Sequence, residues 1–377
     1  KNRLFILSAG GLVFLKMFLG VILLYGIPDL AVGDYFFTPA GGDDLSYVRA
    51  AGSILSGDFN FTSIIGFPLY LAALMLLSGF RSLPQIAAPA ILANIFIIGP
   101  LALIFTMAVV EIIFRRPLYT ALSGAFFIAL PYAWFFFLGD FSLTTVSGAV
   151  DLIGFSRSQH LFGLSLLSDW LSALFFFAGL FFYLSSFFGG RNRPALSGFL
   201  LGLAIAVRVQ NIIPALALVL VLFLLLRFKD SLKLAAGALL GLLPQLAHNV
   251  YMTGRPYLFA DYLPEFNKGL SENTFGLHNL LSLPGRVYRY SPAALAILSV
   301  LSLVFIFLSL LYFRKKKEIF LAIIFAGILS PLSLFMFDST VRNPRYFLPF
   351  IPLFLAVFWA ATEYIFFRKT ISSSRRL

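Results

Sequence analysis

The sequence predicts an all-α membrane protein that crosses the bilayer many times, and two observations carry this prediction. Hydrophobic residues make up 60% of the 377 residues, and the mean hydropathy is +0.94, which is more apolar than a soluble globular domain. Lysine and arginine fall mainly in short turns between long apolar runs, as they do in loops that join membrane helices. Since one crossing takes about 20 apolar residues, we expect about eleven transmembrane helices in one domain, residues 1–377.

Basic turns predict the orientation, because lysine and arginine gather on the cytoplasmic side. The groups expected inside are Lys1/Arg3, Arg115/Arg116, Arg191/Arg193, Arg227/Lys229/Lys233, Arg314–Lys317 and the C-terminal tail 368–377. Leu4–Ile27 is too long for a signal-peptide core and is expected to remain as the first span. The large outer loops are then 28–62 and 253–291.

The later apolar runs can be assigned alternately as outward and inward crossings of the membrane, in agreement with the positions of the basic turns. The expected crossings are 118–138, 167–188, a hairpin of two half-length runs within 195–226, 234–252, 292–313, 318–337 and 346–367. Residues 63–114 must return the chain to the inside. Gly99-Pro100 is a turn or kink signal in that stretch, so we expect three short crossings, or two with a re-entrant piece. No inverted repeat relates the two halves, which disfavours the common secondary-transporter plan.

Composition and motifs exclude several functions. The absence of cysteine excludes disulfides, thiol catalysis and cysteine-bound metals. The net charge of +12 follows from the basic turns, so we predict no nucleic-acid binding. No stretch outside the apolar runs contains a Walker loop or a Gly-x-Gly-x-x-Gly motif, so any donor substrate must come from the membrane or the outer aqueous phase.

Two neighbouring acids, Asp43 and Asp44, open the first candidate site. Helical spacing over Asp43–Leu55 predicts a short helix that lies in the membrane interface. Its apolar side carries Leu45, Val48, Ile54 and Leu55, and the residues off that side include Asp43, Tyr47 and Arg49. A partly desolvated carboxylate there can accept a proton from a hydroxyl group. The alternative is a solvated loop in which Asp43 or Asp44 caps the helix.

Arginines on the outer side form two further candidates. Arg342 and Arg345, followed by Tyr346, open the last span, and arginine can grip a phosphate through two hydrogen bonds. The alternative is that they snorkel to the interface. Arg208 lies between two apolar half-helices, and a charge within a membrane is a functional candidate by default. Its alternative is a structural pair with an outer acid.

Other polar residues are expected to line the substrate. Asp151 and His160 lie near the outer entrance of the 167–188 span, and Asn249 lies where the 234–252 span ends. No His-x-x-x-His or Asp-x-Asp spacing is present. A divalent metal is therefore unsupported, and we predict no cofactor.

Short motifs recur along the chain in a characteristic order. They are Asp43-Asp44, Tyr47, Ala50/Ala51 and Gly57, then Gly66-Phe67-Pro68, Gly202-Leu203-Ala204 before Arg208, Asn249…Tyr251…Gly254-Arg255-Pro256, and Arg345-Tyr346…Pro349…Pro352. In this order they resemble the GT-C membrane glycosyltransferases, in the branch of protein O-mannosyltransferases and aminoarabinose transferases. The chain departs from that pattern in having Asp-Asp where Asp-Glu is usual.

The resemblance implies an inverting glycosyltransferase in a prokaryotic plasma membrane. It would move one sugar from a polyprenyl-phosphate donor, a membrane lipid, to an acceptor hydroxyl outside the cell, on a protein, glycan or lipid. Asp43 would be the base, with Asp44 as the neighbouring or substitute acid. The donor phosphate would be held by Arg342 and Arg345 with help from Arg208, and the substrate would be lined by Tyr47, Arg49, Asp151, His160, Asn249 and Tyr346. The rival function is a lipid or solute transporter, or a non-catalytic lipid-binding membrane subunit.

Overall fold

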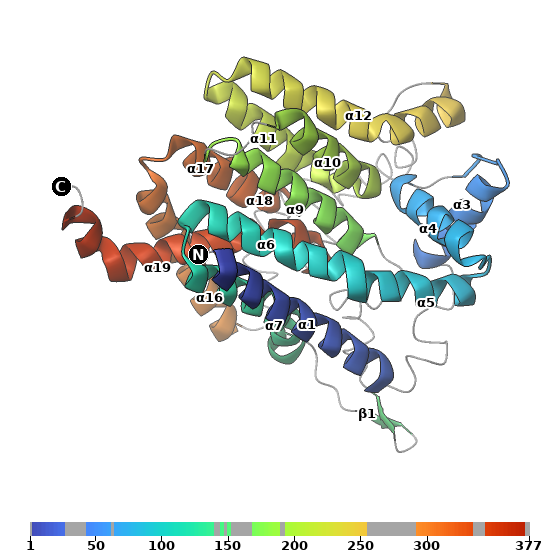
Figure 1. Ribbon diagram of the computed structural model, residues 1–377, viewed down its shortest axis with the longest axis horizontal. Coiled ribbons are helices and arrows are strands. Elements are labelled where there is room, and N and C mark those ends of the chain that lie inside the picture. The colour runs from blue at the N-terminus through green and yellow to red at the C-terminus, as the bar shows by residue number, and fades with distance from the viewer. Residues whose placement is uncertain are drawn as a thin grey trace.

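The computed structural model describes residues 2–26, 43–61, 64–138, 144–146, 149–151, 168–188, 193–254, 292–334 and 344–373. In these ranges the chain is almost entirely helical (Figure 1). The first helices are α1 (Asn2–Gly26), α3 (Asp43–Leu55), α4 (Gly66–Ser78), α5 (Leu83–Ala93), the π-helical η1 (Asn94–Ile98), α6 (Gly99–Phe114) and α7 (Pro117–Leu138).

The remaining helices complete the bundle. They are α9 (Asp169–Ser185), α10 (Pro194–Val207), η2 (Val209–Asn211), α11 (Ile212–Leu224), α12 (Phe228–Thr253), α16 (Pro292–Phe313), α17 (Lys317–Ala322), η4 (Ile323–Leu329), α18 (Ser330–Leu334), η6 (Pro344–Phe350) and α19 (Ile351–Ser373). One small antiparallel hairpin departs from the all-α prediction. It consists of β1 (Thr144–Val146) and β2 (Ala149–Asp151), with Thr144 opposite Asp151.

Several helices suit a membrane. Three described segments, Leu4–Leu24, Gln85–Phe114 and Phe347–Phe366, are long and apolar enough to cross one. Shorter apolar helices accompany them, and large apolar side chains such as Phe14 and Leu77 remain exposed on outward faces. Exposed apolar surface on this scale is expected where lipid is the solvent. The structure therefore fits a membrane protein.

The stretch 63–114 differs from the prediction. Helices α5, η1 and α6 form one continuous helix through Gly99-Pro100, so the expected turn at this dipeptide is wrong. The segment directly before Gly99, Asn94–Ile98, is π-helical, which means that its turn is wider than an α-helical turn. The helix continues through this wider turn and through Gly99-Pro100. The 13 residues of α4 extend over only about 20 Å, which is short of a full crossing.

The glycines of α10 and α12 allow these helices to approach closely. A Cβ added to Gly198 would lie 1.9 Å from the Leu234 carbonyl oxygen, and one added to Gly202 would lie 2.2 Å from that of Ala238. Gly198 faces Leu234 and Gly202 faces Ala238, so α10 and α12 run parallel and in direct contact, and α11, which joins them in the sequence, runs in the opposite direction. Small residues spaced four apart are a common contact between membrane helices.

Basic turns meet at one end of the bundle, here called the basic end. The Arg115 guanidinium donates a hydrogen bond to the Phe188 carbonyl group at 3.3 Å. Lys316 lies 5.9 Å from the ring centre of Phe188, and Arg227 lies 4.6 Å from that of Phe187. Four turns that the sequence assigned to one side of the membrane are therefore neighbours in the structure.

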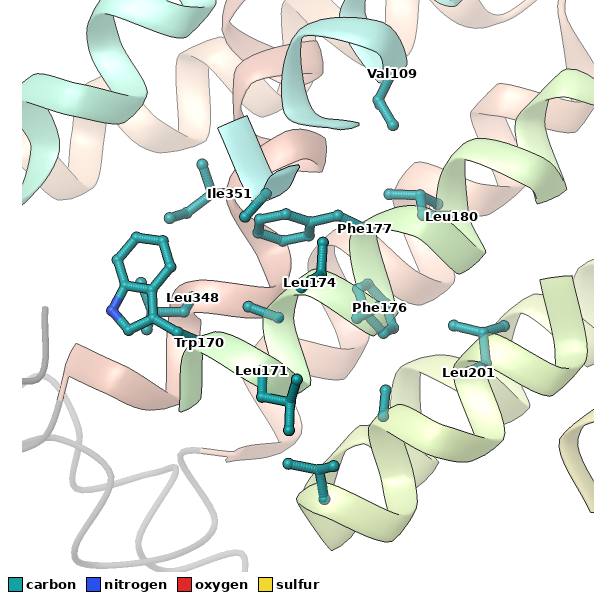
Figure 2. Packing of buried hydrophobic residues seen from close by; sticks show 14 of the residues in the cluster. Val109, Trp170, Leu171, Leu174, Phe176, Phe177, Leu180, Leu201, Leu348 and Ile351 are labelled. Carbon is teal, nitrogen blue, oxygen red and sulfur yellow. The ribbon is translucent and has the colours of Figure 1, made fainter. Parts of the chain in front are cut away.

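The core is organised around α9, which is buried along most of its length. Figure 2 shows its large side chains, including Phe176 and Phe177, among residues of α6, α10 and the η6–α19 segment. Trp170, in the first turn of α9, lies beside Leu348 of η6 (Figure 2). The start of α9 is thereby fixed at the end of the bundle opposite the basic end.

Candidate functional site

A buried ion pair joins Arg208 to Asp169. The Arg208 Nη2 atom lies 3.0 Å from each Asp169 carboxylate oxygen and donates its hydrogen bond to Oδ2, while Nε donates to the Ser168 hydroxyl at 3.0 Å. The two side chains are only 10% and 1% exposed. Because a lone charge at such depth is strongly unfavourable, each partner makes the burial of the other tolerable.

The backbone creates this site by interrupting a helix. Helix α10 ends at Val207, and Arg208 adopts an extended conformation before η2 begins. The Ala204 carbonyl group accepts hydrogen bonds from the Arg208 backbone amide at 2.9 Å and from the Asn211 amide at 3.1 Å. Asn211 also donates to Ser172. We call Ser168, Asp169, Ser172, Arg208 and Asn211 the Arg208 cluster.

The start of α4 rests on the helix break. A Cβ added to Gly66 would lie 2.4 Å from the Ala206 carbonyl oxygen and 2.8 Å from the Val207 amide nitrogen. The Ile65 amide donates to the Gln245 side chain of α12 at 2.9 Å. The loop before α4 and the helix that follows it are therefore fixed directly beside the Arg208 cluster.

Helix α3 is attached to the same place through α4. The Tyr47 ring meets the Phe67 ring edge to face at 5.1 Å. Tyr47 is buried, whereas Arg49 is exposed. The helix has the bounds Asp43–Leu55 that the sequence predicted. The placement of Tyr47 off the apolar side is wrong, because α4 covers the face on which it lies.

Helix α12 supplies Asn249, Gln245 and His248. Gln245 donates to the Asn249 side chain at 2.9 Å, and Asn249 is fully buried. His248 stacks on Phe61 with ring centres 4.5 Å apart, and its Nε2 lies 3.2 Å from the Phe61 carbonyl oxygen. Its Nδ1 has no hydrogen-bond partner within the described ranges. These contacts fix Phe61, which follows α3, to α12.

The other predicted residues are located less fully. For Asp43 and Asp44 in α3, Arg345 and Tyr346 in η6, and Asp151 in β2, the structure describes the backbone alone. Arg342 and His160 lie outside the described residues. Because η6 packs against α9 through Leu348 and Trp170 (Figure 2), Arg345 and Tyr346 occupy the same end of the bundle as the Arg208 cluster.

Lys16 of α1 is a further candidate, outside the residues predicted from the sequence. Its Nζ lies 4.6 Å from the Trp170 ring centre and 5.5 Å from that of Phe127. Its side chain passes over Gly99, where an added Cβ would lie 2.8 Å from the lysine Cε. A single lysine inside the apolar run Leu4–Ile27 was a visible signal.

The described residues contain no group of three His, Cys, Asp or Glu side chains that could hold a metal ion. Comparison of the chain with protein families, with curated proteins and with solved structures finds no match.

Proposed function

We propose that the chain is an integral membrane glycosyltransferase that transfers one sugar from a polyprenyl-phosphate donor to an acceptor hydroxyl, with inversion. One observation supports this most. The helix that begins with Asp43 and Asp44 is attached through α4, at Gly66, to the helix break that precedes Arg208. Acids able to act as a base and a buried arginine thus belong to one end of the bundle, and η6 brings Arg345 to that end.

The chemistry follows from these residue types. Asp43, or Asp44 as its neighbour, accepts the proton of the acceptor hydroxyl. The hydroxyl oxygen attacks the anomeric carbon opposite the phosphate, the carbon–oxygen bond to the phosphate breaks, and the configuration inverts. The electron pair of that bond leaves on the lipid phosphate. Arg345 and Arg342 stabilise the new charge through paired hydrogen bonds, and Arg208, whose own charge is matched by Asp169, holds the start of α9 beside them.

The proposed topology places the basic end in the cytoplasm of a prokaryotic cell and the Arg208 cluster near the outer surface. The continuous helix Gln85–Phe114 counts as one crossing. Helix α4 is not counted, because it begins beside the Arg208 cluster and leads into the end of that long helix that lies opposite the basic end. The proposed total is therefore about ten crossings, with both ends of the chain inside. This arrangement gives the site access to the outer leaflet, where a polyprenyl-phosphate sugar would be presented.

The test is a transfer assay with the purified chain in lipid nanodiscs. A radiolabelled polyprenyl-phosphate sugar is added with candidate protein, glycan and lipid acceptors, and released polyprenyl phosphate is measured along with labelled product. The matched control is the Asp43→Asn/Asp44→Asn double variant. We expect turnover by the wild type alone. Absence of both transfer and donor hydrolysis across the acceptors, or full activity in the double variant, would exclude the proposal.

A transporter is the second candidate, and the break at Arg208 supports it. Interrupted helices with buried polar groups form substrate sites in many transporters. That function predicts movement of a lipid or solute across a vesicle membrane without a covalent product. Flux measured in the same nanodisc-derived preparations, after reconstitution into liposomes, separates the two functions.

A further inference from the structure

Lys16 is held among aromatic rings at the start of α9. Its ammonium lies over Trp170, from α9, and near Phe127, from α7. Contacts of this kind stabilise a cation through the negative face of the ring. Asp169 and Trp170 are consecutive residues in the first turn of α9. Arg208 pairs with Asp169, and the Lys16 ammonium lies over the Trp170 ring.

Lys16 has no counter-charge in the described part of the chain. No described carboxylate contacts its ammonium, and the acid beside Trp170 is already engaged by Arg208. Aromatic faces offset only part of the cost of moving an ammonium out of water. A bound anion would supply the missing charge.

The position of Lys16 indicates where that anion comes from. Lys16 lies in the apolar segment Leu4–Leu24, about 12 Å from its C-terminal end at 1.5 Å per residue. The α1 side chains Phe14 and Phe18 are 69% and 51% exposed, so this helix faces lipid. A lysine can extend its ammonium along the helix toward the membrane surface. Lys16 itself is half-buried, and its ammonium lies at the first turn of α9, so a lipid headgroup can approach it from the end of the bundle that carries the Arg208 cluster.

The bundle is also shaped to admit the lysine. Gly99 has no side chain at the point where the Lys16 Cε passes, and it directly follows the π-helical segment Asn94–Ile98. Such segments occur often at functional sites. A Cβ added to Gly20, one turn after Lys16, would lie 2.9 Å from the Ile95 side chain of η1. Helix α1 is thus fitted to the irregular part of the α5–α6 helix.

We propose that Lys16 binds the phosphate of an anionic membrane lipid at the junction of α1, α7 and α9. The identification of that lipid as the polyprenyl-phosphate donor rests on the proposed function. Lys16 then holds the phosphate from the α1 side, beside the first turn of α9, and it distinguishes a phosphorylated lipid from the corresponding alcohol.

Binding is tested separately from transfer. Wild-type protein, Lys16→Met and Lys16→Arg are placed in nanodiscs of zwitterionic lipid and titrated with undecaprenyl phosphate, undecaprenol, phosphatidylglycerol or inorganic phosphate, with bound lipid read by native mass spectrometry. Lys229→Met, which removes an exposed lysine from the start of α12, is the matched control. Thermal unfolding verifies that each variant folds.

We expect Lys16→Met to weaken undecaprenyl phosphate binding by about tenfold or more, the loss of one charge-assisted contact. Lys16→Arg should bind more tightly than Lys16→Met, and Lys229→Met should match the wild type. Unchanged affinity in Lys16→Met, or equal binding of inorganic phosphate, would overturn the lipid-phosphate site. If phosphatidylglycerol bound as tightly as undecaprenyl phosphate, the identification of the lipid as a polyprenyl phosphate would be overturned. Lost binding in Lys16→Met together with no transfer by the wild type would leave the site standing and contradict only the glycosyltransferase.

Discussion

Gly66, the first residue of α4, touches the Ala206 carbonyl group of α10, two residues before Arg208. A Cβ at this position would lie 2.4 Å from the carbonyl oxygen and 2.6 Å from the carbonyl carbon. Both atoms belong to backbone, which cannot rotate away as a side chain can. This one contact sets the distance between the segment that carries the two acids and the segment that carries the buried arginine.

Gly66→Ala should therefore separate α4 from α10. We expect a loss of about 1–3 kcal/mol in the free energy of unfolding, the usual cost of overpacking, and reduced binding of substrate. Gly52→Ala is the matched control, because a Cβ on Gly52 of α3 has no neighbour within 4 Å. It should stabilise the helix by up to about 1 kcal/mol. Thermal unfolding in detergent compares them, and equal stability of the two variants would contradict the tight contact.

The Arg208–Asp169 pair predicts a characteristic pattern of coupling. Asp169→Asn leaves a buried guanidinium without its carboxylate and should cost about 3–5 kcal/mol of unfolding free energy. The double variant Arg208→Met/Asp169→Leu should be less destabilised than Asp169→Asn, because it buries no charge. Together with the single variants Arg208→Met and Asp169→Leu, this double variant completes a double-mutant cycle, and thermal or denaturant unfolding then measures the coupling.

Arg49 provides the control for this cycle. Its side chain is exposed on α3, so Arg49→Met should change stability by no more than about 0.5 kcal/mol. If Asp169→Asn were as mild as Arg49→Met, the ion pair would not be buried as the structure describes it.

A second buried carboxylate fastens α19 to α7 near the basic end. The Tyr119 hydroxyl donates to Glu363 Oε2 at 2.6 Å, Arg116 contacts Oε1, and Glu363 is 3% exposed. Tyr119→Phe keeps the ring stacked on Trp359 but leaves one carboxylate oxygen without that donor.

We expect Tyr119→Phe to lower the unfolding free energy by about 1–3 kcal/mol, the cost of an unsatisfied buried polar group. Tyr251→Phe is the matched control, since Tyr251 is 65% exposed. Sugar transfer should persist in Tyr119→Phe at temperatures where the variant is folded, because this contact lies far from α3. A selective loss of activity with unchanged unfolding would show that the contact has another role.

Features with a local cause were predictable from the sequence. Helix α3 has the predicted bounds because the spacing of its apolar residues is a local property. The turn expected at Gly99-Pro100 failed because the π-helical segment before it maintains a continuous helix. The positions of lysine and arginine also predicted that the basic turns lie together on one side of the membrane. The contacts of Arg115, Arg227 and Lys316 at the basic end agree with this prediction.

Features that depend on distant packing were not predictable. The partner of Arg208 lies 39 residues earlier in the chain, and several acids were equally plausible until α9 was seen against α10. Tyr47 is buried because α4 folds over it, which the helical spacing of α3 alone does not reveal. The sequence shows that Lys16 is a charged residue in an apolar run. It does not show the aromatic neighbours of Lys16, because they come from the distant helices α7 and α9.

The last prediction concerns which acid is the base. Asp43 and Asp44 precede Tyr47 and Val48, respectively, by four residues, so each lies on the side of α3 that carries a buried residue one turn later. The two acids therefore occupy comparable backbone positions in α3, and both single substitutions should reduce transfer. Asp58 lies after the helix, is exposed, and accepts a hydrogen bond from the Asn60 amide, which makes it a suitable control.

We expect Asp43→Asn to lower kcat by about 10²–10⁴-fold, the usual contribution of a general base, with a smaller loss in Asp44→Asn and none in Asp58→Asn. The asparagine preserves size and hydrogen bonding but cannot accept the proton. Initial rates of label transfer are measured at saturating donor and acceptor, and KM is measured for both. If Asp44→Asn showed the larger loss of kcat, the two roles would be exchanged. Loss confined to KM in both variants would show that the acids bind substrate without taking its proton.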